Sequence, residues 1–573
     1  MDRTAWIVVS LCVIGLIGWQ VYVAKQMPPR TAHVNVASAQ ASPTATPKVP
    51  EASPQPAVAE ATPKNAEAVP SFSEKTETLR NSDVELRLTN RGGGIKEAVL
   101  LKQMAEKGQL VVLNSGQSVP IGAIIEQPSA PTLAEFTASN ESNSVVKFER
   151  TTTDQVVVRK KFSFETSSET KENYVIEMDV DLENRGAKPY QNGGYFVALG
   201  SAAPIHPRDY PSYTRLAWCI DGRAKGIDVN WFGSSAGFLG LNQRAARPYY
   251  QENISGAEWV AVSNQFFTTL MAPLTAKATG VWGRRFDVEY SPEQKLPAIE
   301  GALGMPGFQL QPGQTYSARF EIYAGPKLYH RLAQLSHNEA EVMDFGMFKI
   351  VCQFLLNFMN LLHSWLHDYG LAILALTAII KLTLWPIQNR ANRSMRQMAA
   401  LSPKMQELKD KYKDDPTRMN QELMKLYKQY GINPVGGCLP MMIQIPIFFG
   451  LFKMLGQAVE LRNASFLWVR DLSQPDTIAH LPILGWPINI IPLCMAATQI
   501  WLMAMTPKSG DPTQRRVMMF TPLIFLFICY NFAAALALYY TAQNLFSILQ
   551  FYQNKRQPMP TLEKVASPGK RNR

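Results

Sequence analysis

The sequence predicts a polytopic α-helical membrane protein that carries one large all-β domain outside the membrane. Three patterns predict this fold: an apolar run at residues 5–24, a long series of strand-like segments at residues 72–337, and repeated apolar segments after residue 364. A chain of 573 residues is too long for one ordinary domain. Its mean hydropathy of −0.10 fits a polar half joined to a membrane half.

The first apolar run is about 20 residues long, which is enough to span a bilayer. A cleaved signal peptide is the competing interpretation, because Ala37–Ala39 resembles a small-residue cleavage site. The run is longer than a usual signal-peptide core, however, and that site lies well beyond its end. We therefore expect an uncleaved transmembrane anchor at residues 1–24. Residues 25–71 are rich in Pro, Ala, Thr and Glu and predict a disordered or extended tether.

Residues 72–337 alternate apolar and polar positions in short runs that are broken by Gly, Asn and Pro. This period of two, with many β-branched and aromatic residues, is typical of strands. The glycine-rich stretches Arg91–Gly94 and Asn192–Gly194 indicate turns. So many strands without intervening helices predict a large antiparallel sandwich. The clearest predicted strands are Val84–Thr89, Val156–Phe164, Tyr174–Leu182 and Tyr316–Tyr323.

No pattern of a catalytic, metal or cofactor site accompanies the polar residues. His206 and Asp209 lie in a Pro-rich loop, but no GxSxG, HExxH or glycine-rich phosphate motif goes with them. His363 and His367 are four residues apart and could hold a metal, yet no acidic third ligand lies between them and Trp365 suits a membrane interface. We expect neither enzymatic activity nor a bound cofactor or metal, and we expect the β domain to bind or scaffold.

The rest of the chain alternates apolar segments with basic loops. Basic loops mark the cytosolic side of a membrane protein, so both termini are expected in the cytosol and the β domain outside it. With the N-terminal anchor, the pattern predicts six spans. The predicted segments are an interfacial amphipathic helix at 338–363, membrane helices at 364–387, 438–459, 483–505, 517–532 and 533–553, a cytosolic helical hairpin at 388–437, an outer loop at 460–482, a cytosolic loop at 506–516 and a basic tail at 554–573.

The hairpin carries more basic than acidic residues. Ser402–Pro403 and Asp415–Pro416 are typical helix starts, which predicts two short helices. The segment is interpreted either as an ordinary cytosolic loop or as a docking arm for acidic lipid, RNA or a partner protein. The candidate docking residues are Arg390, Arg393, Arg396, Lys411, Lys425 and Lys428.

Lys381 lies inside the apolar segment Leu371–Gln388, roughly 10–13 Å below its cytosolic end. An ammonium in hydrocarbon costs several kcal/mol unless it is hydrated, paired or able to reach the interface. Its stem could extend to the headgroups, or the ammonium could face a wet cavity among the helices. No carboxylate lies in the core of any predicted span, whereas several polar residues do, which favours the cavity. The predicted cavity residues are Lys381, Thr377, Gln444, Gln499, Tyr539 and Tyr540.

The sixteen residues Asn433–Phe448, NPVGGCLPMMIQIPIF, closely resemble the signature of the YidC membrane-protein insertases of the YidC/Oxa/Alb family. Further matches extend the resemblance over nearly the whole chain; they are Leu376–Pro386, Val459–Arg462, Leu538–Tyr540 and Tyr323–Lys327. The resemblance implies the Gram-negative arrangement of an anchor, a periplasmic β-supersandwich and a five-helix insertase core in the bacterial inner membrane.

By this resemblance, the protein would insert and fold inner-membrane proteins, alone or with the Sec translocon and without nucleotide. A positively charged groove, open to cytosol and lipid, would receive the polar part of the client. The groove cation of the family is usually arginine, and Lys381 stands at the matching position, where it keeps the charge but not the planar fork. The family's frequent Pro-Gly break before the last span is replaced by Tyr530–Ala533. The hairpin and tail would engage nascent chains, ribosomes, Sec-pathway partners or anionic phospholipid, with no specific nucleic-acid sequence.

Two other functions remain open. A secondary transporter also has broken helices and a buried charge, but it predicts inverted repeats, and none is evident between the halves of the membrane region. The other alternative is a membrane-anchored periplasmic scaffold or chaperone in which the β domain does the work.

Overall fold

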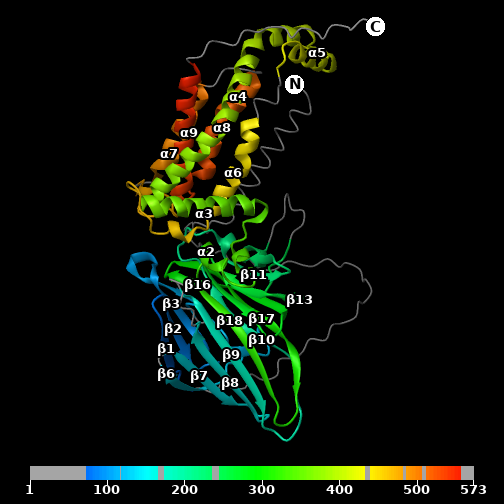
Figure 1. Ribbon diagram of the computed structural model, residues 1–573, viewed down its shortest axis with the longest axis vertical. Helices are drawn as coiled ribbons and strands as arrows, with labels where there is room; N and C mark the ends of the chain where they lie inside the picture. The colour runs from blue at the N-terminus through cyan, green and yellow to red at the C-terminus, as the bar shows by residue number, and fades with distance from the viewer. Residues whose placement is uncertain are drawn as a thin grey trace, which may run out of the picture.

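The computed structural model describes residues 72–555 except 117, 143, 166–172, 235–243, 414, 433–438, 482–484 and 506–511. The predicted anchor at 1–24 and tether at 25–71 lie outside the described residues, as do most of the predicted tail, most of the loop at 506–516 and the start of the sixteen-residue signature. In Figure 1 the β domain forms one end of the molecule and a bundle of helices forms the other.

The β domain consists of antiparallel strands in three main sheets, with the orders β1-β2-β3-β4, β13-β16-β17-β10-β5 and β12-β11-β14-β15-β18-β9-β8-β7-β6. Its core includes fully buried Trp259, Phe267 and Phe320. The strand bounds are β1 Thr76–Arg80, β2 Val84–Thr89, β3 Gly94–Met104, β4 Leu110–Leu113, β5 Ile124–Ile125, β6 Thr137–Ser142, β7 Val145–Thr151, β8 Val156–Phe164, β9 Val175–Asn184, β10 Tyr190–Ala202, β11 Arg215–Ile220, β12 Arg223–Asp228, β13 Tyr250–Ala257, β14 Trp259–Ser263, β15 Phe267–Pro273, β16 Ala278–Ser291, β17 Gln294–Leu310 and β18 Thr315–Pro326. The prediction of a large antiparallel β domain is confirmed.

One predicted turn is present and the other is not. Gly92 and Gly93 have positive φ angles of 78° and 55° between β2 and β3, where side chains are disfavoured. By contrast, Asn192–Gly194 lies inside β10 and pairs with β17. A Cβ on Gly307 of β17 would lie 2.8 Å from the carbonyl carbon of Gly193, so the glycine at position 307 permits a close approach of two strands.

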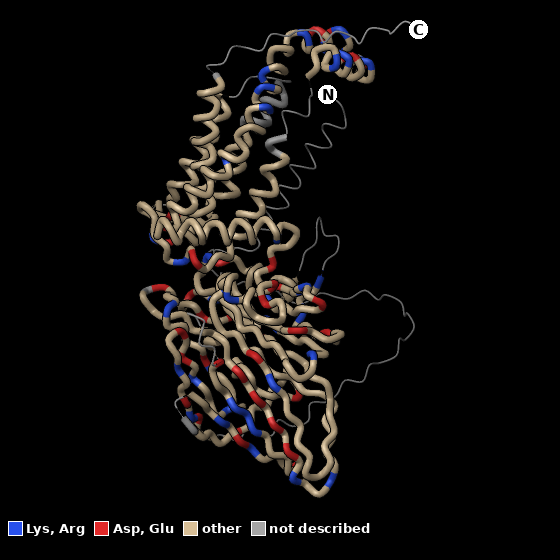
Figure 2. The backbone as a smooth tube through the Cα atoms, viewed as in Figure 1, with Lys and Arg blue, Asp and Glu red and all other residues tan. Residues whose placement is uncertain are grey.

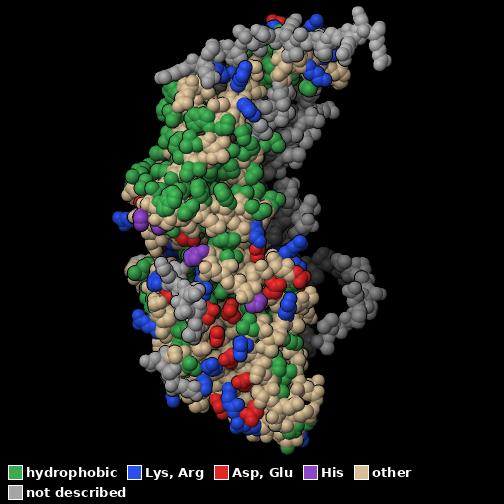
Figure 3. Space-filling model, in the orientation of Figure 1, with side chains coloured by type: hydrophobic (Ala, Val, Ile, Leu, Met, Phe, Trp, Pro, Cys, Tyr) green, Lys and Arg blue, Asp and Glu red, His purple; other side chains and the backbone are tan. Residues whose placement is uncertain are grey.

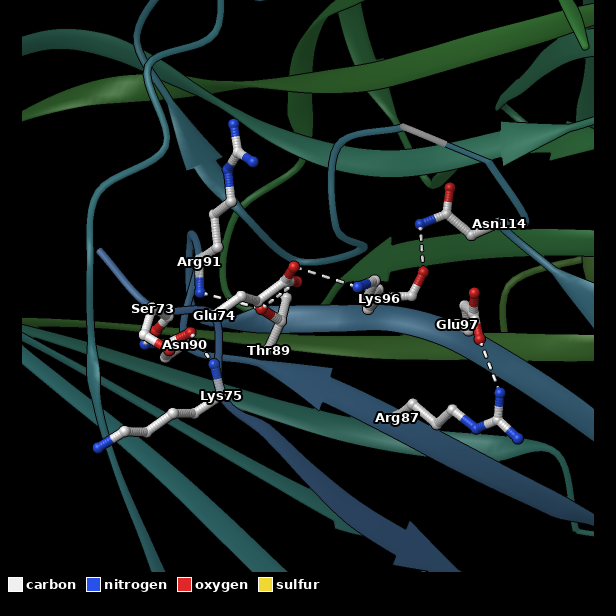
Figure 4. A network of polar contacts seen from close by, with 10 residues as sticks. All are labelled: Ser73, Glu74, Lys75, Arg87, Thr89, Asn90, Arg91, Lys96, Glu97 and Asn114. Carbon is white, nitrogen blue, oxygen red and sulfur yellow. Dashed lines mark hydrogen bonds and ion pairs between the residues drawn. The ribbon is translucent and has the colours of Figure 1, made fainter. Parts of the chain in front are cut away.

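A polar network fixes the first described residues to the sheet (Figure 4). Glu74 accepts hydrogen bonds from Thr89 at 2.8 Å and from Lys96 at 3.1 Å. The backbone N–H of Lys75 donates to Oδ1 of Asn90 at 2.8 Å. The chain is therefore held against the β2–β3 turn as it enters the domain.

The connection from the β domain to the helices is not one amphipathic helix from residue 338, and that prediction is wrong at its start. It contains short α2 (Tyr329–Leu332), the 3₁₀ turns η4 (Glu339–Met343) and η5 (Gly346–Phe348), and then α3 (Lys349–Leu366). Asn338 and Asp344 have left-handed φ angles of 60° and 45°, which an α-helix cannot contain. Helix α3 lies between the β domain and the bundle in Figure 1.

Helix α4 runs without a break from Tyr369 to Lys411, so no boundary falls at residue 388 and the predicted helix start at Ser402–Pro403 is wrong. Pro386 and Pro403 both lie inside the helix. Apolar packing of Leu401 against Tyr430 and Ile432, with neighbouring methionines of α4, holds the segment around Pro403 together. Helix α5 (Pro416–Gln429) does begin at the other predicted site, where the Asp415 side chain accepts the N–H of Arg418 at 3.0 Å.

The remaining helices are α6 (Leu439–Leu455), α7 (Ile490–Met505), α8 (Pro512–Cys529) and α9 (Ala534–Lys555). Before α7 the chain forms the turn η7 (Val459–Leu461) and a hairpin of β19 (Thr477–His480) and β20 (Pro487–Asn489), so the helix begins at residue 490 rather than 483. Asp476 explains this start, because its Oδ2 accepts the N–H of Ile491 at 2.7 Å.

Among the described residues, one helix, α4, is long and apolar enough to cross a membrane; shorter apolar helical stretches are Met442–Leu455, Ile490–Met505 and Phe520–Cys529. Figure 2 shows few charged residues along the bundle, and Figure 3 shows a broad apolar surface over it. Exposed apolar side chains of the bundle include Phe527, Leu382 and Leu549. Such a surface suits contact with lipid.

Gly370→Ala should destabilise the protein, because a Cβ at this position of α4 would overlap the ring of Phe466. Overpacking of this kind costs about 1–3 kcal/mol. Thermal unfolding of the purified protein in detergent should show a lower Tm than for Gly193→Ala, whose added Cβ would meet nothing within 4 Å. Equal Tm values for the two variants would show that the α4–Phe466 contact is not tight.

Candidate functional site

Lys381 turns its ammonium towards α9 rather than away from the bundle. Its Nζ donates to Oγ of Ser547 at 2.9 Å, and that hydroxyl donates to the carbonyl oxygen of Gln543 at 3.0 Å. The lysine side chain is half-buried. It borders a small pocket between α4, α6 and α9, which is lined by Lys381, Leu384, Ile387, Gln388, Ile443, Gln444 and Gln550.

Gln444 connects α6 to the same face of α9. Its Nε2 donates to Oε1 of Gln543 at 3.0 Å and to the hydroxyl of Tyr539 at 3.3 Å. Tyr539, Gln543 and Ser547 are spaced four residues apart, so they follow one another along one face of the helix. A continuous polar strip therefore connects Gln444 to Lys381 through α9.

The strip continues along α4 and α9 towards the far end of the bundle. Nε2 of Gln550 donates to Oδ1 of Asn389 at 2.8 Å and to the carbonyl of Trp385 at 3.3 Å. Asn554 donates to the same Asn389 oxygen at 3.1 Å and accepts from Arg396 at 2.9 Å. We call this whole set the polar seam; its residues are Lys381, Trp385, Asn389, Arg396, Gln444, Tyr539, Gln543, Ser547, Gln550 and Asn554.

Three of the predicted cavity residues do not join the polar seam. Thr377 is fully buried, and its hydroxyl donates to the Ile373 carbonyl one turn earlier at 2.7 Å. Tyr540 packs its ring near Phe448, with centroids 5.4 Å apart, on another side of α9 from Tyr539. Gln499 is half-buried on α7 and makes no hydrogen bond to the seam within the described part of the chain.

Sequence reasoning missed Ser547, Asn389 and Asn554. For the two α9 residues, Ser547 and Asn554, the spacing gives a signal that could have found them, because Gln543, Ser547, Gln550 and Asn554 recur at intervals of three or four in α9. No such signal marks Asn389 of α4.

The predicted docking residues lie at the far end of the bundle from the β domain, and Figure 2 shows basic residues gathered along the end of α4 and on α5. Arg390, Arg393, Lys411 and Lys428 are exposed, and Lys425 is exposed with an ion pair to Glu422 at 2.7 Å. Arg396 is half-buried in the seam. The charge is therefore presented outward, except at Arg396.

The β domain is fastened to the bundle through buried polar contacts. Nζ of Lys327, the residue after β18, donates to Oε1 of Gln457 at 3.1 Å in the loop after α6. Gln265 donates to the carbonyl of Gly456 at 2.8 Å in the same loop. Lys327 is 1% exposed, and its burial, with the nearby charge of Arg215, lowers its pKa to about 7.

The structure thus combines a β domain, a bundle of apolar helices and a lysine that faces a polar seam inside the bundle. Together with the apolar surface of the bundle, these features fit a helical membrane protein that has a cation among its helices. Comparison with known proteins identifies the family. Residues 77–358 match the family described as YidC periplasmic domain, and residues 361–560 match the family described as 60Kd inner membrane protein.

Individual relatives agree with this assignment. The chain is 30% identical over 475 residues to the membrane protein insertase YidC of Geotalea daltonii, covering 82% of each chain. It is 38% identical over 302 residues to that of Syntrophobacter fumaroxidans, covering 51% of this chain and 53% of the relative, so the match spans about half the length of that protein. A crystal structure described as an active YidC insertase is 19% identical, with 85% of this chain and 94% of that chain covered and a TM-score of 0.35.

The protein belongs to the YidC family. The resemblance predicted from the sequence is confirmed. The family assignment identifies a protein of the inner membrane whose β domain is a periplasmic domain.

The stability that Lys327 contributes should depend on pH. Between pH 7 and about 10.5 the unfolded chain keeps the proton on Lys327 while the folded protein releases it, so the unfolded state binds more protons and stability rises with pH. Raising the pH from 7 to 9 should therefore increase the free energy of unfolding of the wild type relative to Lys327→Met, by at most about 1.4 kcal/mol per pH unit. Thermal unfolding at each pH should show this as a growing difference in Tm.

Lys161→Met is the control, because Lys161 is a half-buried residue of the β domain that is paired with Asp179 at 3.5 Å. The difference in Tm between Lys161→Met and the wild type should stay constant between pH 7 and 9. If the Lys327→Met difference is also constant, the amino group keeps its proton in the folded interface.

Proposed function

We propose that this protein inserts and folds proteins in the bacterial inner membrane, and that the polar seam receives the polar flank of each client. The observation that carries the proposal is the bonding of Lys381. Its ammonium donates to a serine hydroxyl, and no carboxylate forms an ion pair with it among the described residues. A cation without a counter-ion inside a bundle attracts an acidic or polar segment that enters beside it.

The seam supplies the other groups that such a flank needs. A client backbone or side chain that leaves water must find new hydrogen-bond partners. Gln444, Tyr539 and Gln543 offer both donors and acceptors, and their present bonds to one another can be exchanged for bonds to a client. No fuel is required, because an apolar client segment of about 20 residues gains several kcal/mol on entering lipid. The protein only has to lower the barrier for the flank.

The short helices beside the seam support this account. Helix α6 has 17 residues and α7 has 16, which at 1.5 Å per residue gives roughly 24–26 Å. The hydrocarbon core of a bilayer is about 30 Å thick, so these helices favour a locally thinner membrane. A thinner membrane shortens the path of the polar flank.

The topology that fits this function has six spans: residues 1–24 and helices α4, α6, α7, α8 and α9. Both termini lie in the cytosol and the β domain in the periplasm. The seam then opens towards the basic end of α4 and α5. There Arg390, Arg393 and Lys428 contact anionic phospholipid, ribosomes carrying nascent chains, or the Sec translocon. The protein inserts clients either alone or together with that translocon.

Substitutions of Lys381 test the proposal. Lys381→Glu should abolish insertion because it repels an acidic flank, Lys381→Arg should preserve it because the charge remains, and Lys381→Ala should be intermediate. Insertion of a single-span client with an acidic periplasmic flank into proteoliposomes measures the effect, which we expect to exceed about tenfold for the Glu variant.

Lys453→Glu serves as the matched control, since Lys453 is a cation on α6 whose ammonium lies 5.9 Å from the ring of Tyr213 at the periplasmic end. It should affect insertion less than Lys381→Glu. Normal insertion by Lys381→Glu would refute the electrostatic part of the proposal.

A further inference from the structure

Three potential metal ligands meet where the β domain passes into the membrane bundle. Glu321 lies on β18, His337 follows α2, and Glu339 begins η4. One carboxylate oxygen from each glutamate and a ring nitrogen of His337 lie within 4.8 Å of one another. The residues are far from the polar seam in the chain and take no part in the proposed insertion.

Three side-chain atoms of this cluster, one from each residue, are buried without a hydrogen bond. Glu339 is fully buried, and its Oε2 accepts the backbone N–H of His337 at 2.8 Å. Its Oε1 accepts no hydrogen bond, and neither does Oε1 of Glu321. Nδ1 of His337 is also buried without a hydrogen bond, although it lies 3.4 Å from Oε1 of Glu339. Leaving buried polar atoms unsatisfied costs about 1–3 kcal/mol each. The 3.4 Å contact between His337 and Glu339 still leaves Oε1 of Glu321 without a partner, so the cluster indicates a missing ligand.

The spacing fits a tetrahedral metal ion. Zinc binds nitrogen and oxygen ligands at about 2.0–2.2 Å, which puts neighbouring ligands of a tetrahedron about 3.3–3.6 Å apart. The 3.4 Å between His337 and Glu339 agrees with that edge. Glu321 needs only a side-chain adjustment to complete a third corner, because its ligand atom is already within 4.8 Å of both others.

The charges also fit a dication. Arg331 faces the cluster, but its guanidinium is paired with Glu165 at 3.2 Å, which leaves the two cluster carboxylates with a net charge of minus two when ionised. Burial raises the pKa of both Glu321 and Glu339, because the charged carboxylates are poorly solvated. A divalent cation would remove that cost.

We propose that Glu321, His337 and Glu339 bind a divalent transition-metal ion, with Zn²⁺ the best fit and a water molecule in the fourth position. The imidazole disfavours Mg²⁺ and Ca²⁺, which prefer six or more oxygen ligands. The ion links the segment between β18 and α3 to the sheet by bridging their side chains. It thereby fixes the orientation of the β domain relative to the membrane.

Metal binding to the untagged full-length protein in detergent tests this assignment. After treatment with EDTA, equilibrium dialysis against Zn²⁺ should give one bound ion per chain. His337→Ala and Glu339→Gln should each weaken binding by about tenfold or more. Replacement by Co²⁺ should produce the visible absorption of a tetrahedral site in the wild type and not in His337→Ala.

Two controls separate this site from others. Glu341→Gln changes the same 3₁₀ turn at a residue that is paired with Lys349, and His363→Ala removes a histidine of α3 that stacks on Tyr369. Both should keep full binding. His337 is the more reliable test position, because its side chain is 34% exposed and its loss should not prevent folding.

Absence of stoichiometric Zn²⁺ from the wild type would overturn the proposal. Binding that survives in both His337→Ala and Glu339→Gln would overturn it as well. Because the readout is metal content rather than insertion, its result is independent of the fate of the insertase proposal.

Discussion

The ammonium of Lys381 sets the main constraint on the bundle, because a cation among apolar helices must be given polar neighbours or it destabilises them. Ser547 is one such polar neighbour. Further polar residues follow on the same face of α9 and form hydrogen bonds to α4 and to Gln444 of α6. On another side, Asn544 donates to the Met495 carbonyl of α7 at 3.3 Å. Helix α9 is thus the element through which α4, α6 and α7 are joined.

The β domain is positioned by a second set of buried polar contacts. Lys327 and Gln265 bond to the loop after α6, and Gln474 donates to Oδ1 of Asp209 at 3.1 Å from the loop before α7. These contacts connect the domain to the chain just after α6 and to the chain before α7. A metal ion bound by Glu321, His337 and Glu339 would add a third attachment, on the segment that connects β18 to α3. The periplasmic domain is then a rigid cap on the bundle rather than a freely tethered module.

Local sequence patterns predicted the features that depend on local physics. The alternation of β2 and β8 gave their bounds, and Asp415–Pro416 gave the start of α5, because strand alternation and N-capping act within a few residues. Features that depend on distant partners could not be found this way. Pro403 remains inside α4 because Leu401 packs on Tyr430, and Tyr539 rather than Tyr540 faces Gln444 because of how α9 is rotated.

Comparing positions 539 and 540 tests most directly whether clients pass along the polar seam. A photoreactive residue is placed at each position in turn, and a ribosome-stalled single-span client is offered. Crosslinks are expected from position 539, which lies in the seam, and far fewer from position 540, which packs against Phe448 and Phe525. Equal crosslinking from both positions, or crosslinks from 540 alone, would contradict a client path along the seam.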